Sequence, residues 1–300
     1  MRLGVAIPVV DVEIGGDPGA IREFARVAEE IGYQDLALPD HVLGVNVANR
    51  SGWGNRNTSA DLFQDPFVLF GFLAGCTKDI GFSTQVLILA QRQTVLVAKQ
   101  AACLDVLCGH RFRLGVGVGW NETEFVGLNE DFHNRGRRSE EQVQVMQALW
   151  AEPHVTFRGR WHTIDDAGIN PLPASHSIPI WFGGHADVTL RRVARWGAGW
   201  MPLSYPPGDE AKAAIDKLRA YTAAEGRNPA SIGIDTRVAV GLGDETAWRE
   251  TVRTWKSIGV TNLTLATYSG RGHLRRIEGR KLADHLTAIR RYWDAVADLL

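Results

Sequence analysis

Apolar and polar positions along this 300-residue chain follow two alternating periods. Short, nearly unbroken apolar runs predict strands that are covered on both faces of a parallel sheet. Apolar positions three or four residues apart predict amphipathic helices between those strands. The clearest helix follows Asp17-Pro18, an N-cap residue with a proline at the first helical position. The strands are predicted at residues 3–10, 36–38, 80–89, 112–118, 178–182, 199–203, 232–240 and 261–267.

Eight strand–helix units in order predict the α/β class and a single (β/α)8 TIM barrel that spans residues 1–300. A doubly wound sheet is the alternative, although it normally needs fewer units. Two segments exceed a minimal barrel. The first, residues 42–64, follows strand 2 and leaves from the face where barrel active sites lie, as a lid, a substrate wall or a tolerated insertion. The second, residues 153–177, precedes strand 5 and predicts a hairpin that pairs 155–157 with 161–164.

Composition and charge exclude several classes of function. A net charge of −1 gives no overall attraction to nucleic acid or to an anionic membrane. No apolar run reaches the roughly 18 residues of a membrane span, and a strand pattern that starts at Arg2 leaves no room for a signal peptide. The three cysteines form no C-x-x-C pair, and the nine histidines show no H-x-x-x-H or H-E-x-x-H spacing. We therefore expect a cytoplasmic protein with no metal site, whose partner is a small organic molecule.

The end of the second strand carries a candidate catalytic pair, Asp40-His41. Side chains at the C-terminal end of a barrel strand reach the mouth. A histidine there suits proton transfer or a hydrogen bond to a cofactor ring, because its pKa is ordinarily near neutrality. A histidine that only bonds loop backbone is the alternative.

Glycines at two strand ends indicate places where a cofactor approaches the backbone. The fourth strand ends in Gly117-Val118-Gly119-Trp120 before an acidic helix, and the fifth ends in Gly183-Gly184-His185 before another helix. Exposed N–H groups at such a helix start hold phosphate well. The spacing around Gly119 does not match a dinucleotide fingerprint. Relief of crowding inside a barrel and a plain strand-to-helix turn remain the alternatives.

Several longer motifs together resemble one known family. They are DHVLG, STQVLILAQRQTVLVAKQAACLD, GHRFRLGVGVGWNETEF, FHNRGRRSEE and IPIWFGGHADVTLRRVARWGAGWMP. In this order and at these intervals they resemble the bacterial luciferase-like oxidoreductase superfamily, and most closely the branch that uses the deazaflavin coenzyme F420. The resemblance covers residues 3–203, and the last third shows only barrel periodicity.

The resemblance implies a TIM barrel that binds F420, or alternatively FMN, at its C-terminal mouth. It implies a bulge in the third strand, often with a cis non-prolyl peptide, on which the cofactor ring leans. It also places the cofactor phosphate at the Gly183-Gly184 turn. The resulting cofactor-binding set is Asp40, His41, Thr84, Gln85, Val86, Gly117, Val118, Gly119, Trp120, Gly183, Gly184 and His185.

Two neighbouring positions refine this expectation. Trp120 stands where similar deazaflavin sugar-phosphate dehydrogenases have a glutamate as proton acceptor, so we do not expect that activity. Glu122 and Glu124 are expected to bond loop backbone or arginines rather than to act in catalysis.

The expected function is hydride transfer between reduced F420 and a small organic substrate, with His41 handling the proton. The alternatives are an FMN-dependent monooxygenase that uses O2 and a barrel that binds flavin without turnover. Trp53, in the polar segment, is expected to close over an aromatic or terpenoid-like substrate or to anchor its own loop. A homodimer is common in this superfamily, but the sequence shows no distinct interface stripe.

Overall fold

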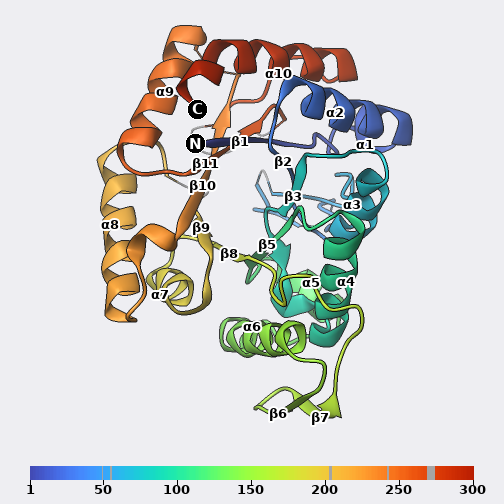
Figure 1. Ribbon diagram of the computed structural model, residues 1–300. Helices are drawn as coiled ribbons and strands as arrows, with labels where there is room; N and C mark the ends of the chain where they lie inside the picture. The colour runs from blue at the N-terminus through green and yellow to red at the C-terminus, as the bar shows by residue number, and fades with distance from the viewer. Residues whose placement is uncertain (49, 55, 203–204, 242, 269–273) are drawn as a thin grey trace.

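Eight parallel strands close into a barrel (Figure 1). The computed structural model describes residues 1–48, 50–54, 56–202, 205–241, 243–268 and 274–300. Closure comes from β11, which pairs with β1 so that Arg2 lies opposite Asn262. A doubly wound sheet is thereby excluded. In order the barrel strands are β1 (Arg2–Ala6), β2 (Asp35–Leu38), β3 (Gly81–Thr84) continued by β4 (Leu87–Ile88), β5 (Phe112–Gly117), β8 (Ile180–Gly183), β9 (Gly199–Met201), β10 (Gly233–Ala239) and β11 (Asn262–Ala266).

Helices cover the outside of the barrel, as the periodicity predicts. Asp17 and Asp65 cap the first two long helices, because each carboxylate accepts a hydrogen bond from a backbone N–H of the first turn. The predicted strand 199–203 ends at Met201, and its residue 203 lies outside the described part of the chain. The long helices are α2 (Pro18–Ile31), α3 (Pro66–Ala74), α4 (Thr94–Leu107), α6 (Arg135–Ala151), α7 (Asp187–Trp196), α8 (Asp209–Ala224), α9 (Glu245–Ser257) and α10 (Leu282–Val296).

Two predicted strands are shorter than expected. The first ends at Ala6 because Pro8 has no N–H for the sheet and the chain turns there, into the short α1 (Val12–Gly15). The third breaks after Thr84 at a cis peptide bond between Gln85 and Val86, and the chain continues through β4 into the 3-10 helix η1 (Leu89–Gln91). The expected bulge is confirmed. Gln85 and Val86 are called the shelf below.

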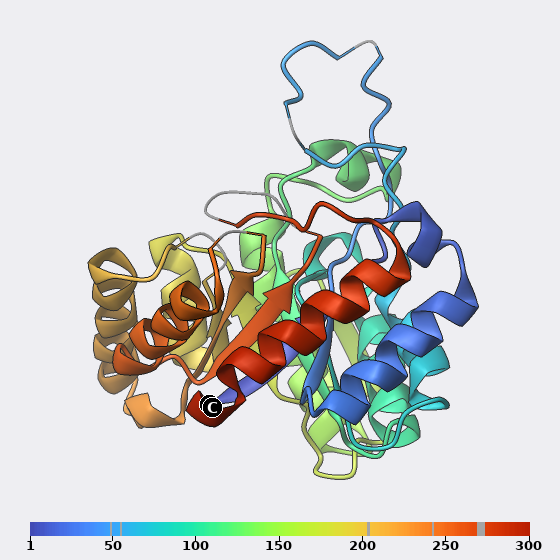
Figure 2. The ribbon, with the colours of Figure 1, turned by 90° about the horizontal axis from the view of Figure 1, so that it is seen from above.

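Both insertions lie where the sequence predicts them. The segment between β2 and α3 projects beyond one end of the barrel (Figure 2), and its residues 49 and 55 are outside the described chain. The second insertion contains the hairpin β6 (Val155–Arg158) and β7 (Thr163–Ala167). Its turn is longer than predicted, because Phe157 pairs with Ile164 and three N–H groups of the turn donate to the Glu141 carboxylate.

The interior is filled by large apolar side chains, with Trp150, Trp200 and Trp255 fully buried. One extra helix matters for the site: α5 (Glu122–Gly127) follows β5 and lies under the projecting segment (Figure 2). Within the described ranges, no helix combines the length and the apolar character that crossing a bilayer needs.

Candidate active site

A cavity of about 490 Å³ opens at the mouth of the barrel. This volume lies in the range of small-molecule sites, and the mouth is where TIM barrels carry their active sites. Its walls come from many parts of the chain. They include the ends of β2 and β4, β10, the shelf, Trp120 between β5 and α5, the projecting segment and the connection from β11 to α10. The residues that matter for the argument are Asp11, Asp40, His41, Phe63, Gln85, Val86, Trp120, Arg237, Arg276 and Arg280.

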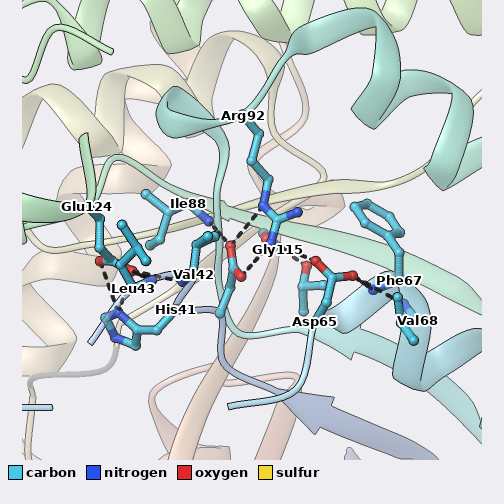
Figure 3. A network of polar contacts seen from close by, with 12 residues as sticks. His41, Val42, Leu43, Asp65, Phe67, Val68, Ile88, Arg92, Gly115 and Glu124 are labelled. Carbon is cyan, nitrogen blue, oxygen red and sulfur yellow. Dashed lines mark hydrogen bonds and ion pairs between the residues drawn. The ribbon is translucent and has the colours of Figure 1, made fainter. Parts of the chain in front are cut away.

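His41 is held by a buried carboxylate from a different element (Figure 3). Its Nδ1 lies 3.1 Å from Oε2 and 3.3 Å from Oε1 of Glu124, on α5. The same carboxylate accepts the backbone N–H groups of Val42 at 2.8 Å and Leu43 at 3.2 Å. Because an ionised carboxylate only accepts, Nδ1 carries a hydrogen and Nε2 is the ring nitrogen left for a ligand.

The environment keeps Glu124 ionised although it is buried. Burial by itself raises the pKa of this carboxyl, since desolvation disfavours the charge. The hydrogen bond and charge of His41, together with the two backbone N–H groups, outweigh burial and lower its pKa. The carboxylate therefore holds the imidazole of His41 in a fixed orientation beside the cavity.

Asp40 joins three elements. Its carboxylate accepts from the N–H of Ile88 at 3.0 Å and from the guanidinium of Arg92 at 2.7 Å and 3.2 Å. Arg92 also donates to Asp65, the N-cap of α3, at 2.9 Å. Figure 3 shows Arg92 beside the carboxylate of Asp65. Asp40 is 2% exposed, so it borders the cavity mainly as a brace for β4.

The shelf is anchored by side chains of β10 and β11. The side-chain amide of Gln85 donates to Asp235 at 3.1 Å and to Thr264 at 2.7 Å. The carbonyl of Gln85 accepts from the guanidinium of Arg237 on β10 at 3.0 Å. Burial raises the pKa of Asp235, while its ion pair with Arg113 opposes the rise. The shelf is thus fixed by the barrel interior, with Val86 turned to the cavity.

Two of the predicted cofactor glycines make room for a side chain. A Cβ at Gly117 would lie 2.5 Å from Cγ2 of Val86, and one at Gly183 would lie 2.7 Å from its Cγ1. Thr84 is fully buried, and its hydroxyl donates to the carbonyl of Gly115 at 2.7 Å. In the described structure, Gly117 and Gly183 therefore relieve crowding, because they leave room for the side chain of Val86.

An aromatic group stands over the other side of the mouth. Trp120 is 38% exposed, and its ring centroid lies 5.8 Å from that of His41. Phe63 of the projecting segment lies 4.8 Å from the same imidazole. Gly119, with φ +75°, turns the chain here. Phe63 and Trp120 are called the aromatic wall below.

Trp53 takes a different place from the one expected for a substrate contact. It lies behind Trp120, with 5.7 Å between ring centroids, and is not among the residues that line the cavity. Its indole N–H donates to the carbonyl of Asn57 at 3.0 Å. Arg56 lies 5.6 Å from both indole rings. In this structure Trp53 anchors its own loop and backs Trp120.

The Gly183-Gly184-His185 turn borders a second, smaller cleft. The cleft is lined by Gly117, Val118 and Gly183 together with polar groups from Ser139, Thr189 and Arg192. Gly184 has φ +122°, and its carbonyl accepts from the indole of Trp200 at 2.7 Å. Arg192 is buried and pairs with Glu140 at 2.8 Å. The hydroxyls, the guanidinium and the start of α7 are groups that suit a phosphate.

The structure therefore brings most predicted positions together at one end of the barrel. His41, the shelf and Trp120 share the main cavity, and Val118 and the diglycine turn share the cleft beside it. Glu124 was expected to bond loop backbone or arginines, and its bonds to loop backbone are confirmed. Its contact with His41 was missed, although an acidic residue early in a helix after a mouth strand was a usable signal. Arg237 and Arg276, from the last third of the chain, carried no sequence signal beyond their charge.

Comparison with known proteins gives one family and several relatives. A family profile described as luciferase-like monooxygenase matches residues 1–300. An uncharacterized protein of Mycobacterium tuberculosis is 35% identical over 206 residues, which cover 65% of this chain and 70% of that protein. An FMNH2-dependent dimethylsulfone monooxygenase of Pseudomonas putida is 25% identical over 247 residues, 81% of this chain and 64% of that protein.

Solved structures share the fold at low sequence identity. A monooxygenase from Streptomyces bottropensis superposes with a TM-score of 0.77 at 16% identity and covers 100% of this chain and 99% of its own. An F420-dependent secondary alcohol dehydrogenase, solved with an F420–acetone adduct, gives 0.74 at 16% identity over 96% and 98% of the two chains. At this sequence identity, the similarity establishes the barrel architecture only. The chemistry has to be inferred from the residues of the site.

Proposed function

The chain belongs to the luciferase-like monooxygenase family, and we propose that it is an oxidoreductase that transfers hydride between reduced coenzyme F420 and a small organic substrate. The observation that carries the proposal is the fixed His41–Glu124 pair beside the shelf in one cavity. Among the similar proteins, an F420-dependent alcohol dehydrogenase supports this proposal. A monooxygenase that uses reduced FMN supports the second candidate, described below.

The residues present fit a tricyclic ring. Val86 and Ile88 offer an apolar face on one side of the cavity. The Nε of Arg237 is buried without a hydrogen-bond partner among the described groups, so a polar edge of a ligand would satisfy it. The hydroxyl of Thr189 and the backbone N–H groups at the start of α7, beside Gly183, would receive the phosphate of the cofactor chain.

The protein's own part in the reaction is to position and to move one proton. Reduced F420 supplies a hydride. Nε2 of His41 gives a proton to a substrate oxygen, or takes one in the reverse direction, while Glu124 holds the ring and stabilises the imidazolium. The aromatic wall limits the access of water to this point.

The test is a titration of the purified protein with F420 and, separately, with FMN, followed by turnover measurements. Reduced F420 is offered with a panel of ketones, aldehydes and activated alkenes. We expect His41→Ala to lower turnover by roughly 100-fold and to leave cofactor affinity within about threefold. The matched control is His154→Ala, an exposed histidine of the hairpin. Unchanged turnover in H41A, or no saturable spectral change with either cofactor, would refute the proposal.

An FMN-dependent monooxygenase is the second candidate. It is supported by the sequence relationship to the dimethylsulfone enzyme over 81% of this chain. The two candidates differ in their need for oxygen. Substrate-dependent consumption of O2 with reduced FMN, and no anaerobic turnover with F420, would establish the second candidate and reject the first.

A further inference from the structure

One side of the mouth carries three arginines, of which only one is paired with a carboxylate in the described part of the chain. Arg237, Arg276 and Arg280, called the cationic wall, all line the main cavity. Arg276 is paired, since its guanidinium lies 3.2 Å from both oxygens of Asp11. Arg237 and Arg280 form no ion pair with any residue in the described part of the chain.

The acidic residues of the cavity are engaged elsewhere. Asp11 is 4% exposed and also lies 3.2 Å from Nε2 of the buried His285, so it holds Arg276 from a fixed position. Asp40 is bound by Arg92. Asp61 is exposed and accepts from the N–H of Thr58 at 2.7 Å. A guanidinium that lines a cavity without a counter-ion is available to pair with the carboxylate of a bound ligand.

The cationic wall is separate from the diglycine turn expected to hold the cofactor phosphate. Asp11 follows β1, Arg237 is on β10, and Arg276 follows β11, so the wall belongs to the sector β10–β11–β1. The diglycine turn ends β8, which is separated from β10 by β9 and from β11 by β9 and β10. Arg237 also touches the shelf, whereas Arg276 and Arg280, which follow β11, lie farthest from the diglycine turn.

The same cavity is also lined by the aromatic wall. Phe63 and Trp120 stack edge-on against His41 at 4.8 Å and 5.8 Å between centroids. Aromatic side chains in such positions favour a planar, apolar part of a ligand. The cationic wall would not bind such an apolar part. One cavity thus offers an apolar wall, a proton-handling histidine and a cationic wall.

We propose that the substrate is an organic acid with a planar apolar body, which lies against the aromatic wall, and a carboxylate, which binds Arg280. Arg276, held by Asp11, adds a fixed positive charge to the same cavity. This inference rests on the proposed function for the statement that the bound acid is a substrate. The recognition itself requires only the cavity.

The experiment measures binding by calorimetry with benzoate and with benzamide, which has nearly the same shape and no charge. We expect benzoate to bind at least about tenfold more tightly than benzamide. Arg280→Gln, which removes the charge of an exposed side chain, should weaken the binding of benzoate about tenfold and leave that of benzamide unchanged. The matched control Arg290→Gln removes the same charge from an exposed position on α10.

Equal affinity for benzoate and benzamide would overturn the inference, and so would equal effects of R280Q and R290Q. A loss of F420 or FMN affinity in R280Q, with benzoate binding intact, would assign the wall to the cofactor instead and would also overturn it. Calorimetry needs no turnover and no cofactor. Failure of the proposed function would appear in the cofactor titration, and failure of this inference in the comparison of acid with amide.

Discussion

At the residue scale, the proposed proton transfer depends on two side chains, His41 and Glu124, that are 83 positions apart in the sequence. His41 ends a barrel strand and Glu124 lies in the helix after another, so the fold alone brings them together. Position at a strand end predicted His41 from the sequence. The contact with Glu124 was not predictable, because it depends on how the α5 helix leans over the mouth and on the course of residues 42 and 43.

Glu124→Gln tests this pair. The amide keeps the shape of the side chain, but it can no longer stabilise a charged imidazole, and its NH2 group cannot accept the hydrogen bonds that the second carboxylate oxygen accepts. We expect turnover to fall about 10- to 100-fold with little change in cofactor affinity. Glu122→Gln, an exposed carboxylate one position before Thr123 on the same helix, is the matched control. Equal activities of the two variants would reject the orienting role.

The same carboxylate predicts a dependence of stability on pH. Its pKa is lower in the folded protein than the ordinary value of 4.5, so the unfolded chain binds more protons as the pH falls. Its stabilising contribution is therefore complete above about pH 5 and is lost as the pH drops through the lower, folded-state pKa. The difference in unfolding free energy between the wild type and E124Q should be constant from about pH 7 to about pH 5 and shrink below that. A difference that grows on acidification would have the wrong sign.

At the scale of elements, the shelf is held by strands that meet only in the closed barrel. The carbonyl and amide of Gln85 reach β10 and β11, and Val86 fills the space left by Gly117 and Gly183. The resemblance predicted the bulge at these positions. It could not predict that two glycines serve Val86, because that is a matter of interatomic distances across strands.

Gly117→Ala tests this packing. The new Cβ would lie 2.5 Å from a methyl of Val86, a side chain with one strongly preferred rotamer, so we expect a loss of about 1–3 kcal/mol in the free energy of unfolding and weaker cofactor binding. Adding Val86→Ala should restore part of the stability, since it removes the methyl that clashes. Gly71→Ala, which meets nothing within 4 Å in helix α3, should be neutral or stabilising. Destabilisation that V86A does not relieve would contradict the assignment.

Across the whole molecule, the sequence was most informative about order and count. Eight alternating units predicted a closed barrel, and both insertions lie where polar runs and turn residues indicated. The predicted strand ends were less accurate. Strands end where backbone hydrogen bonds to the neighbouring strand stop, as they do near Pro8 and after Thr84, and hydrophobic periodicity does not report these bonds. The cationic wall was not predictable at all. Arg237 lies on β10, while Arg276 and Arg280 lie in the connection from β11 to α10, and only the fold places them around one cavity.

The measurement that tests the account most directly is a crystal structure of the protein with oxidised F420 or FMN. The account predicts the ring against Val86, with His41 on the same side of the mouth and the phosphate beside Gly183 and Thr189. A ring bound away from the shelf, or a phosphate held by Arg276 and Arg280, would contradict it.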